Sequence, residues 1–177
     1  MKKLIFLTGH PGVGKTTALR RAINLLTERG LRVGGMVSSE IREGGRRVGF
    51  EVIDISTSRR GILAQVYKGV GPRFGRYTVN IADLVAVGVN AIKRAVNTAD
   101  IIVVDEVGPM ELLSPEFREA VKKAVDSGKV VVGTLHHNAR GDLIDWIRSN
   151  LASKIIEVTL ANREGLPRAI VDMVLDA

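Results

Sequence analysis

The residues whose types and spacing most clearly predict chemistry lie near the amino terminus, where residues 9–16 read GHPGVGKT. The spacing G-x-x-x-x-G-K-T is that of a P-loop, in which backbone N–H groups at the start of a helix surround phosphate groups. Glycines let the backbone approach a ligand closely and adopt positive φ angles. In such a loop Lys15 reaches the β- and γ-phosphates of a nucleotide, and the hydroxyl of Thr16 binds Mg²⁺. The motif therefore predicts a site for a nucleotide with Mg²⁺.

The segments on either side of this loop have the patterns of a strand and a helix. Before the loop, a short apolar run suits a buried strand near residues 3–8. After it, apolar residues recur at helical spacing, which predicts a helix over residues 15–29 that ends before Gly30. The loop is thus expected at the carboxyl end of a strand and at the start of a helix, where P-loops bind phosphate.

Two adjacent acids follow a later apolar run, Ile101-Ile102-Val103-Val104. A strand buried on both faces would deliver Asp105 at its carboxyl end beside the P-loop, where a carboxylate can hold the shell of Mg²⁺. Glu106 is a candidate base that orients or deprotonates the attacking water. Glu111 lies either in the outer shell of the Mg²⁺ or simply ahead of the next helix, and the sequence leaves both interpretations open.

Polar side chains also end the apolar run near residues 130–135. Thr134 and His136 are candidates to sense the γ-phosphate or to hold the lytic water, although histidines of a surface loop are the simpler interpretation. His136 and His137 have no third ligand at metal spacing, so we expect no zinc site.

The transition state of phosphoryl transfer needs positive charge opposite the γ-phosphate. Lys15 and Mg²⁺ supply part of this charge, and an arginine finger is the usual source of the rest. The sequence offers Arg73, Arg76, Arg140 and Arg163 as candidates, and composition alone does not choose among them.

Strand and helix patterns alternate along most of the chain. The alternation predicts an α/β fold, a three-layer sandwich with a mostly parallel sheet and ligands at the carboxyl ends of the strands. A turn signal and apolar residues at strand spacing interrupt the alternation and predict a β-hairpin insertion near 39–66, followed by a glycine-rich loop to Tyr77. The expected strands cover 3–8, 33–38, 101–105, 130–135 and 154–159, and the expected helices cover 15–29, 82–97, 115–127, 141–149 and 166–175.

Length and composition predict a globular protein with a single domain over residues 1–177. The chain has no cysteine, which excludes disulfides and cysteine-based metal sites. No apolar stretch approaches the ~18 residues of a membrane span, and the amino-terminal apolar run is too short for a secretion signal. We therefore expect a cytoplasmic protein that does not bind membranes.

The net charge is +7, and the basic excess lies mainly in residues 1–60. A phosphate-rich partner such as nucleic acid is one interpretation, and an ordinary solvated basic surface is the other. Aromatic residues make up only 4% of the chain, which is poor for base stacking. Nucleic acid is thus a possible partner that the sequence does not favour.

Four motifs together resemble those of a known family. They are the P-loop, the stretch D-E-x-G-x-M-E-L at residues 105–112, the stretch R-x-G-x-Y-x-V at residues 73–79, and the pair Asn162-Arg163. In order and spacing, from end to end, the chain resembles the small nucleoside-triphosphatase family described from thermophilic microbes, whose human relative is called cancer-related nucleoside-triphosphatase.

This resemblance implies a P-loop fold of the RecA-like branch and Mg²⁺-dependent hydrolysis of ATP, GTP, CTP and UTP with broad base tolerance. It implies that Lys15 and Glu106 are catalytic, that Arg73 is the preferred arginine finger, and that the metal is held by Thr16 and Asp105. It also places Asn162 and Arg163 on a late loop that contacts the base or the phosphates. The full set expected to bind the nucleotide is Gly9, His10, Pro11, Gly12, Val13, Gly14, Lys15, Thr16, Thr17, Asp105, Glu106, Asn162 and Arg163.

Three functions remain open at the level of sequence. The first is a stand-alone hydrolase of several nucleoside triphosphates, which agrees with the absence of an N-K-x-D guanine-reading motif. The second is a kinase for a small molecule or a nucleic-acid hydroxyl, in which the arginine-rich hairpin would be a lid over the acceptor. The third is an ATPase that nucleic acid stimulates. We favour the hydrolase, acting as a monomer.

Overall fold

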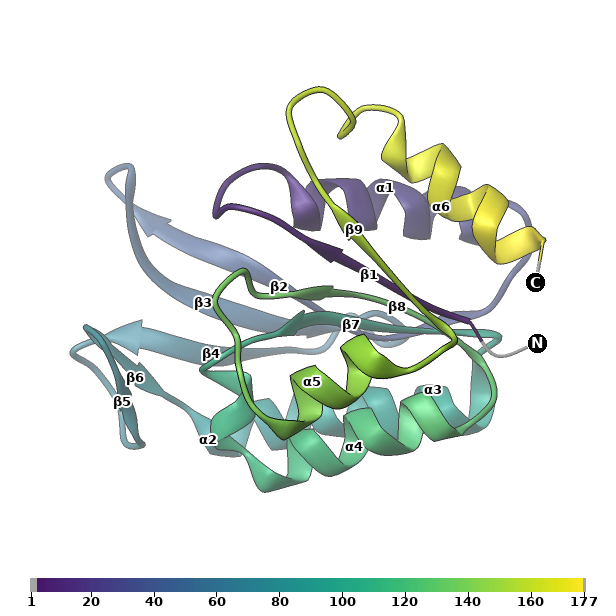
Figure 1. Cartoon of the computed structure of the whole chain (residues 1–177). Coiled ribbons are helices and arrows are strands. Elements are labelled where there is room, and N and C mark those ends of the chain that lie inside the picture. The colour runs from purple at the N-terminus through teal and green to yellow at the C-terminus, as the bar shows by residue number, and fades with distance from the viewer. Residues whose placement is uncertain (1–2, 177) are drawn as a thin grey trace.

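The computed structural model describes residues 3–176, and within them nine strands form one sheet in the order β5-β6-β4-β3-β2-β7-β8-β1-β9. One half of the sheet is parallel (Figure 1). Its strands are β1 (Leu4–Thr8), β2 (Val33–Glu43), β7 (Ile101–Val107), β8 (Val130–Leu135) and β9 (Ser153–Glu157). The predicted parallel strands are therefore confirmed, with ends that shift by a few residues.

Helices cover both faces of the parallel half (Figure 1). One face carries α1 (Lys15–Glu28) and α6 (Leu166–Leu175), and the other carries α3 (Asn90–Thr98), α4 (Pro115–Asp126) and α5 (Asp142–Ser149). Strand β1 shows why the sheet holds two helix layers: Leu4 and Phe6 pack into one apolar cluster, while Ile5 and Leu7 pack into the other. Successive side chains of a strand point to opposite faces, so a strand that is apolar throughout requires cover on both sides. The three-layer prediction is confirmed.

Helix α4 follows from local chemistry. The hydroxyl of Ser114 accepts a hydrogen bond from the backbone N–H of Phe117 at 3.1 Å, and Pro115 occupies the first turn. The N–H groups of the first turn have no partner within a helix. The Ser114 hydroxyl binds one of them, and Pro115 has no N–H that would need a partner. Gly128 follows the helix with φ of 79°. This helix confirms the prediction for residues 115–127 to within one residue.

The helix expected over residues 82–97 is confirmed as an almost continuous helical segment with an irregular middle. It consists of α2 (Ile81–Asp83), a π-helical stretch over Leu84–Val89, and α3. The side chain of Asn80 begins it by accepting a hydrogen bond from the N–H of Asp83 at 3.0 Å. No helix in the described residues is both long and apolar enough to cross a membrane.

The antiparallel half of the sheet is larger than the hairpin that the sequence indicates. It adds β3 (Arg46–Asp54), β4 (Arg60–Val66), β5 (Arg73–Phe74) and β6 (Tyr77–Val79). The prediction that a strand ends at residue 38 is wrong, because β2 runs on to Glu43 and pairs with β3 from Met36 to Glu43. Beyond residue 38 one face of this strand lacks a helix, so polar residues replace the apolar pattern although the backbone stays paired.

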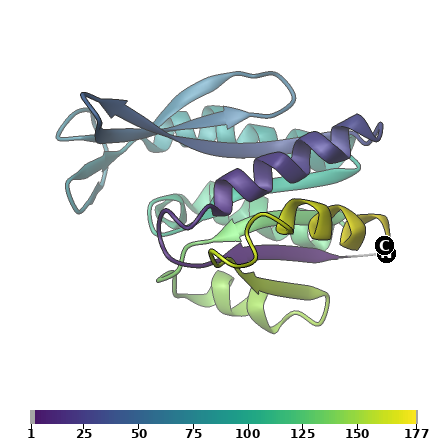
Figure 2. The ribbon, with the colours of Figure 1, turned by 90° about the horizontal axis from the view of Figure 1, so that it is seen from above.

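The glycine-rich loop expected up to Tyr77 is also corrected. Residues 73–79 contain a small hairpin in which β5 pairs with β6, and β6 pairs in turn with β4. These strands are too short to carry an apolar alternation, so their pairing depends on the sheet edge beside them. Seen from above, the ends of the antiparallel strands project beyond the amino-terminal end of α1 (Figure 2).

Candidate functional site

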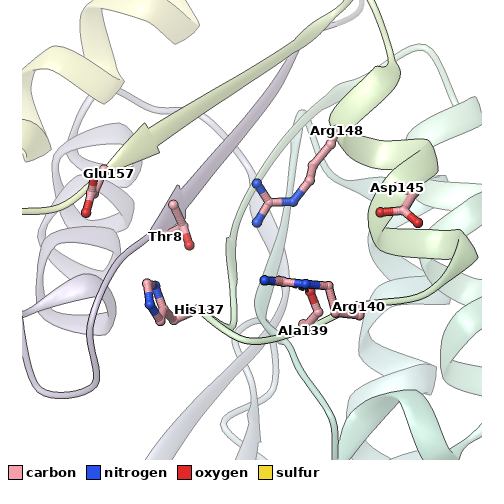
Figure 3. Close-up of a pocket in the computed structure, with 7 residues that line it drawn as sticks. All are labelled: Thr8, His137, Ala139, Arg140, Asp145, Arg148 and Glu157. Carbon is pink, nitrogen blue, oxygen red and sulfur yellow. Dashed lines mark hydrogen bonds between the residues drawn. The ribbon is translucent and has the colours of Figure 1, made fainter.

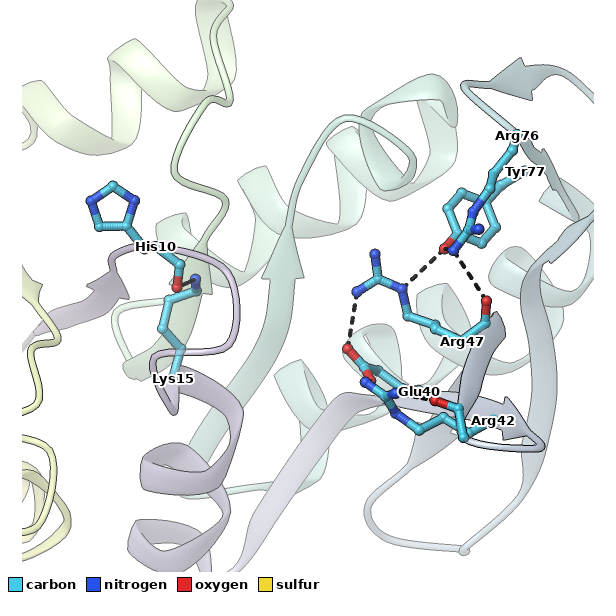
Figure 4. A network of polar contacts seen from close by, with 8 residues as sticks. His10, Lys15, Glu40, Arg42, Arg47, Arg76 and Tyr77 are labelled. Atoms are coloured by element: carbon cyan, nitrogen blue, oxygen red, sulfur yellow. Dashed lines mark hydrogen bonds and ion pairs between the residues drawn. The ribbon is translucent and has the colours of Figure 1, made fainter.

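The P-loop joins the carboxyl end of β1 to the start of α1, as its sequence predicts. Its backbone takes positive φ at Gly9 (142°), Gly12 (77°) and Gly14 (111°), which are angles that favour glycine. The ammonium group of Lys15 donates hydrogen bonds to the carbonyl oxygens of Gly9 at 2.7 Å and His10 at 3.2 Å (Figure 4). Lys15 thus lies across its own loop. Burial lowers the pKa of Lys15, against the opposite influence of the nearby carboxylates Glu106 and Asp105.

Asp105 lies at the carboxyl end of β7 and is fully buried. Its carboxylate accepts hydrogen bonds from the hydroxyl of Thr134 at 2.6 Å and the hydroxyl of Thr16 at 3.3 Å. The backbone N–H of Ser38 approaches the other oxygen at 3.5 Å. Burial raises the pKa of Asp105, and these hydrogen bonds oppose the rise. Three strands and the P-loop therefore meet at one carboxylate, which brings Asp105 to Thr16 as the sequence predicts.

Glu106 and Glu111 form a second acidic pair beside Asp105. Burial and the charge of Asp105 raise the pKa of Glu106 to about 7, while Lys15 lowers it. A Cβ atom on Gly108 would lie 3.0 Å from Oε1 of Glu106 and 2.9 Å from Oε2 of Glu111, so the two side chains converge on that glycine. Glu111 is buried in a short 3₁₀ turn, Glu111–Leu113, and burial followed by the charge of Glu106 raises its pKa. Glu111 thus belongs to this site, and it is more than a solvated acid ahead of α4.

The polar residues at the end of β8 lie in different places: Thr134 is buried against Asp105, whereas His136 faces the cleft. The hydroxyl of Thr134 is buried and bound to Asp105, so it orients that carboxylate instead of facing an open strand tip. His136 lines the cleft above the P-loop, and burial, followed by the charges of Lys15 and His137, lowers its pKa. His137 stacks near His10 of the P-loop, with ring centroids 4.6 Å apart. Among residues 3–176, no three His, Asp or Glu side chains form a metal cluster by themselves.

A cleft of about 590 Å³ opens above the P-loop and reaches the antiparallel half of the sheet. On the side of the loop it is lined by Lys15, Thr16, Glu106, Glu111 and His136. On the opposite side it is lined by residues of β2, β3, β4, β5 and β6, namely Ser38, Ser39, Glu40, Arg47, Phe50, Leu63, Phe74 and Tyr77. Figure 4 shows Lys15 on one side of this space and Arg47 and Tyr77 on the other. The cleft is therefore shared between the P-loop and the antiparallel strands, of which β5 and β6 carry the R-x-G-x-Y-x-V stretch.

The arginines that line this cleft are not those that the sequence suggests. Arg20 and Arg47 line it, whereas Arg73, the preferred candidate, lies on the edge strand β5 with its guanidinium 5.3 Å from the ring of Tyr67. Arg76 lies behind Arg47 and donates to its carbonyl oxygen at 3.1 Å. An edge strand leaves long polar side chains in solvent, so a motif position alone does not bring Arg73 to the phosphates.

The sequence predicts Arg47 only as one arginine of the arginine-rich hairpin, and strand alternation alone would not place it in the cleft. With two residues per repeat, Arg47 and Phe50 would point to opposite faces of β3. The register between β2 and β3 shifts between Ile41 and Arg42, which pair with Gly49 and Arg47, so Val48 is left over as a bulge. A bulge re-aims the side chains next to it, and the Arg47 guanidinium lies 5.0 Å from the Phe50 ring centroid. Only the pairing of the two strands shows this.

The late loop after β9 brings one of its two predicted residues to the P-loop. Nη1 of Arg163 lies 3.4 Å from the carbonyl oxygen of Val13. The Asn162 side chain instead closes its own turn: it accepts from the N–H of Thr159 and donates to the carbonyl of Glu157, each at 2.8 Å. Arg163 therefore contacts the loop, and Asn162 shapes the turn that holds it.

A second cavity, of about 410 Å³, lies on the other side of His137. It is lined by Thr8, His137, Ala139, Arg140, Asp145, Arg148 and Glu157. Figure 3 shows Arg140 and Arg148 extending toward the space beside Thr8 and His137. The candidate Arg140 thus belongs to this cavity and does not line the cleft above the P-loop.

Comparison with known proteins finds relatives over almost the whole chain. A protein-family model described as NTPase matches residues 4–171. The nucleoside-triphosphatase THEP1 of Thermofilum pendens is 51% identical over 166 residues, which cover 93% of this chain and 91% of the relative. The protein of the same name from Methanocaldococcus jannaschii is 43% identical over 173 residues, covering 97% and 96%.

Two solved structures share the fold over almost their full lengths. The crystal structure of THEP1 from Aquifex aeolicus matches with a TM-score of 0.84 and 28% identity, covering 97% of this chain and 98% of that one. The solution structure of a human cancer-related nucleoside triphosphatase matches with a TM-score of 0.84 and 33% identity, covering 99% and 98%. A family model that spans nearly the whole chain, together with these relatives, shows that the chain belongs to the NTPase family.

Proposed function

We propose that this chain hydrolyses nucleoside triphosphates at the γ-phosphate with the help of Mg²⁺. The observation that carries the proposal is the contact between the P-loop hydroxyl of Thr16 and the buried carboxylate of Asp105, with Glu106 as the next residue. P-loop hydrolases need these groups together: a phosphate cradle, oxygen ligands for the metal, and a base beside them. The family name of the relatives supports the same activity.

The residues present fit Mg²⁺. Thr16 and Asp105 offer a hydroxyl and a carboxylate oxygen 3.3 Å apart, and Mg²⁺ prefers such hard oxygen ligands and completes its shell with phosphate oxygens and water. Thr134 orients the Asp105 carboxylate from behind. Bound there, Mg²⁺ would neutralise part of the charge that develops on the phosphates.

The other residues divide the remaining work. The P-loop backbone and Lys15 hold the phosphate oxygens, and Arg163 supports the loop from the side of α6. Glu106 orients a water molecule and takes its proton as the water oxygen bonds to the γ-phosphorus and the bond to the β-phosphate oxygen breaks. A carboxyl with a pKa of about 7 suits a base that works near neutral pH. A finger role for Arg73 stays a prediction that requires the β5–β6 hairpin to move toward the P-loop.

We propose broad base tolerance, with ATP, GTP, CTP and UTP all as substrates, because the chain has no N-K-x-D motif that would read guanine. We further propose that residues 1–177 act as one domain and as a monomer. The lack of cysteine agrees with a reducing compartment such as the cytoplasm.

Replacing Glu106 by glutamine tests the mechanism. Glu106→Gln keeps the shape of the side chain but removes the base, so phosphate release is expected to fall ~10²-fold or more while nucleotide binding persists. Glu119→Gln on the exposed face of α4 makes the same chemical change away from the site and is the control. If Glu106→Gln released phosphate as fast as the unchanged protein, Glu106 would not be the base.

A panel of triphosphates separates the proposed hydrolase from the other two functions. Phosphate release from ATP, GTP, CTP and UTP is measured with Mg²⁺, alone and with RNA, DNA or a nucleoside mixture. A stand-alone hydrolase is supported if all four triphosphates are turned over at similar rates and if RNA, DNA and the nucleosides leave these rates unchanged. Turnover that needs one of the additions contradicts it.

A further inference from the structure

The cleft above the P-loop extends well beyond the space that a triphosphate chain needs. Lys15 and Glu106 mark the end of the P-loop where the γ-phosphate is proposed to lie, and both line the cleft. Arg163, whose late loop is predicted to contact the base or the phosphates, lies against Val13 and does not line the cleft. The part of the cleft formed by β3, β4, β5 and β6 therefore lies beyond the γ-phosphate and away from the proposed position of the base. We call this part the far wall; its residues are Arg47, Phe50, Leu63, Phe74 and Tyr77.

The far wall is aromatic, in a chain with few aromatic residues. The rings of Phe50 and Tyr77 lie 5.3 Å apart between centroids, at an angle of 58°. Leu63 is buried beneath them, whereas Phe74 is 42% exposed at the mouth of the cleft. Apolar and aromatic side chains around a few fixed polar groups are typical of sites for small organic molecules. Hydrolysis of a γ-phosphate does not require such a surface.

A cluster of arginines stands at and behind this wall (Figure 4). Nη1 of Arg47 donates to Glu40 at 3.0 Å, and its Nε donates to the Tyr77 hydroxyl at 3.0 Å. Arg42 binds the same carboxylate at 2.6 Å. Arg76 donates to the Tyr77 hydroxyl at 3.2 Å and to the Arg47 carbonyl, and within residues 3–176 it forms no ion pair with a carboxylate.

Arg42 and Arg47 thus share the carboxylate of Glu40, and Arg76 lies beside them, which leaves an excess of positive charge at the wall. The hydrogen bonds to Glu40 and Tyr77 also hold the Arg47 fork in place before any ligand arrives. A fixed guanidinium is well suited to the oxygens of a phosphate. The ring surface and this charge lie next to each other, so one ligand can use both.

We propose that the far wall binds a second small molecule, a nucleoside monophosphate, while a triphosphate occupies the P-loop. Its base lies against Phe50, Phe74 and Tyr77, and its phosphate faces Arg47. The site opens onto the proposed position of the γ-phosphate, so the second ligand sits on the side from which water attacks. Tyr77 belongs to the R-x-G-x-Y-x-V stretch, whereas Arg47, Phe50 and Leu63 lie outside the motifs that the sequence shares with the family.

Calorimetry tests the proposal with the full chain. A non-hydrolysable triphosphate analogue with Mg²⁺ is first bound to saturation, and AMP, GMP, CMP and UMP are then titrated in turn. We expect at least one monophosphate to bind once per chain. Arg47→Gln and Phe74→Ala are each expected to weaken this binding tenfold or more while leaving the affinity for the analogue unchanged. Phe74 is half-exposed, so its truncation keeps the core intact.

Arg59→Gln is the matched control, because Arg59 is exposed and does not line the cleft. Failure of the analogue itself to bind would contradict the proposed function. With the analogue bound, failure of all four monophosphates would overturn the second site alone. Equal weakening by Arg47→Gln and Arg59→Gln would overturn it too, because the effect would then come from net charge. Competition between monophosphate and analogue would also overturn it, since the wall would then hold the base of the triphosphate.

Discussion

Single residues in this site act mainly through their neighbours. Thr134 is the clearest case, because its hydroxyl lies 2.6 Å from a buried carboxylate that the metal is proposed to use. Buried carboxylates keep their orientation through such hydrogen bonds, and their partners tune metal affinity without touching the metal. Thr134 is therefore a positioning residue in the proposed mechanism.

Thr134→Val removes this hydrogen bond but keeps the shape of the side chain. We expect the Mg²⁺ concentration for half-maximal phosphate release to rise ~10–100-fold, because the Asp105 carboxylate loses the partner that orients it. The measurement is a Mg²⁺ titration of phosphate release. Thr98→Val, which removes an exposed hydroxyl within α3, serves as the control. An unchanged Mg²⁺ requirement would show that Thr134 does not orient the metal ligand.

At the scale of elements, the site depends on the register between β2 and β7. Val33 pairs with Ile101 at the start of both strands, and Asp100 fixes this point from the residue before β7. Its carboxylate accepts hydrogen bonds from the Arg32 backbone N–H at 2.8 Å and from Nη2 of the same residue at 2.7 Å. The register set there decides where Ser38 and Asp105 meet at the other end of the strands.

The Arg32–Asp100 pair predicts a pH dependence of stability. Hydrogen bonds from the side chain and backbone of Arg32 lower the pKa of Asp100 to about 2, from an ordinary value of 3.8. A lowered pKa means that the pair stabilises the fold above pH ~4 and that this stabilisation is lost as the pH falls through about 2. Asp100→Asn should therefore lower Tm at pH 7, with a deficit that shrinks between pH 4 and 2.

The prediction is checked by measuring the Tm of the unchanged protein and of Asp100→Asn from pH 7 down to pH 2. Asp172→Asn, at an exposed position of α6, is the control and should give no such trend. A Tm deficit of Asp100→Asn that stays constant down to pH 2 would mean that the charge of Asp100 does not contribute.

At the scale of the whole molecule, the P-loop links both halves of the core. It begins at β1, which is buried on both faces, and continues into α1, which packs against α6. A ligand that binds only this folded arrangement stabilises the whole chain by mass action. Nucleotide binding is thus expected to appear in global stability.

A non-hydrolysable triphosphate with Mg²⁺ should raise Tm. At a ligand concentration 100 times Kd, the expected stabilisation is about 2.7 kcal/mol. Thermal unfolding with and without the ligand measures it. Lys15→Ala should remove most of the shift, because the ammonium group that holds the phosphates is gone. A shift of the same size in Lys15→Ala would mean that the ligand binds elsewhere.

The distribution of charge over the molecule bears on nucleic acid as a partner. Several arginines of the basic first third are paired within the sheet: Arg42 and Arg47 with Glu40, and Arg60 with Glu51. Asp54 similarly binds Arg94. Carboxylates of the antiparallel strands therefore neutralise part of the basic excess, which argues against an extended surface for the backbone of a nucleic acid.

The sequence by itself determined the parts whose chemistry is local. Three parts each depend on residues close together in the chain: the P-loop with its glycines and Lys15, the apolar strand that carries Asp105, and the helix that Ser114 begins. The parallel order follows from strand–helix alternation, since consecutive parallel strands must be joined by helices. Asp105 and Thr16 then meet because carboxyl ends of parallel strands share one edge of the sheet.

Only the tertiary structure decided the rest, because it depends on pairing between distant residues. A bulge in β3 turned Arg47 into the cleft, and the edge position of β5 kept Arg73 out of it. Glu111 joined Glu106 because a 3₁₀ turn folds back across Gly108. Strand register, bulges and the folding back of loops depend on what packs against them, and no local pattern in the sequence records that.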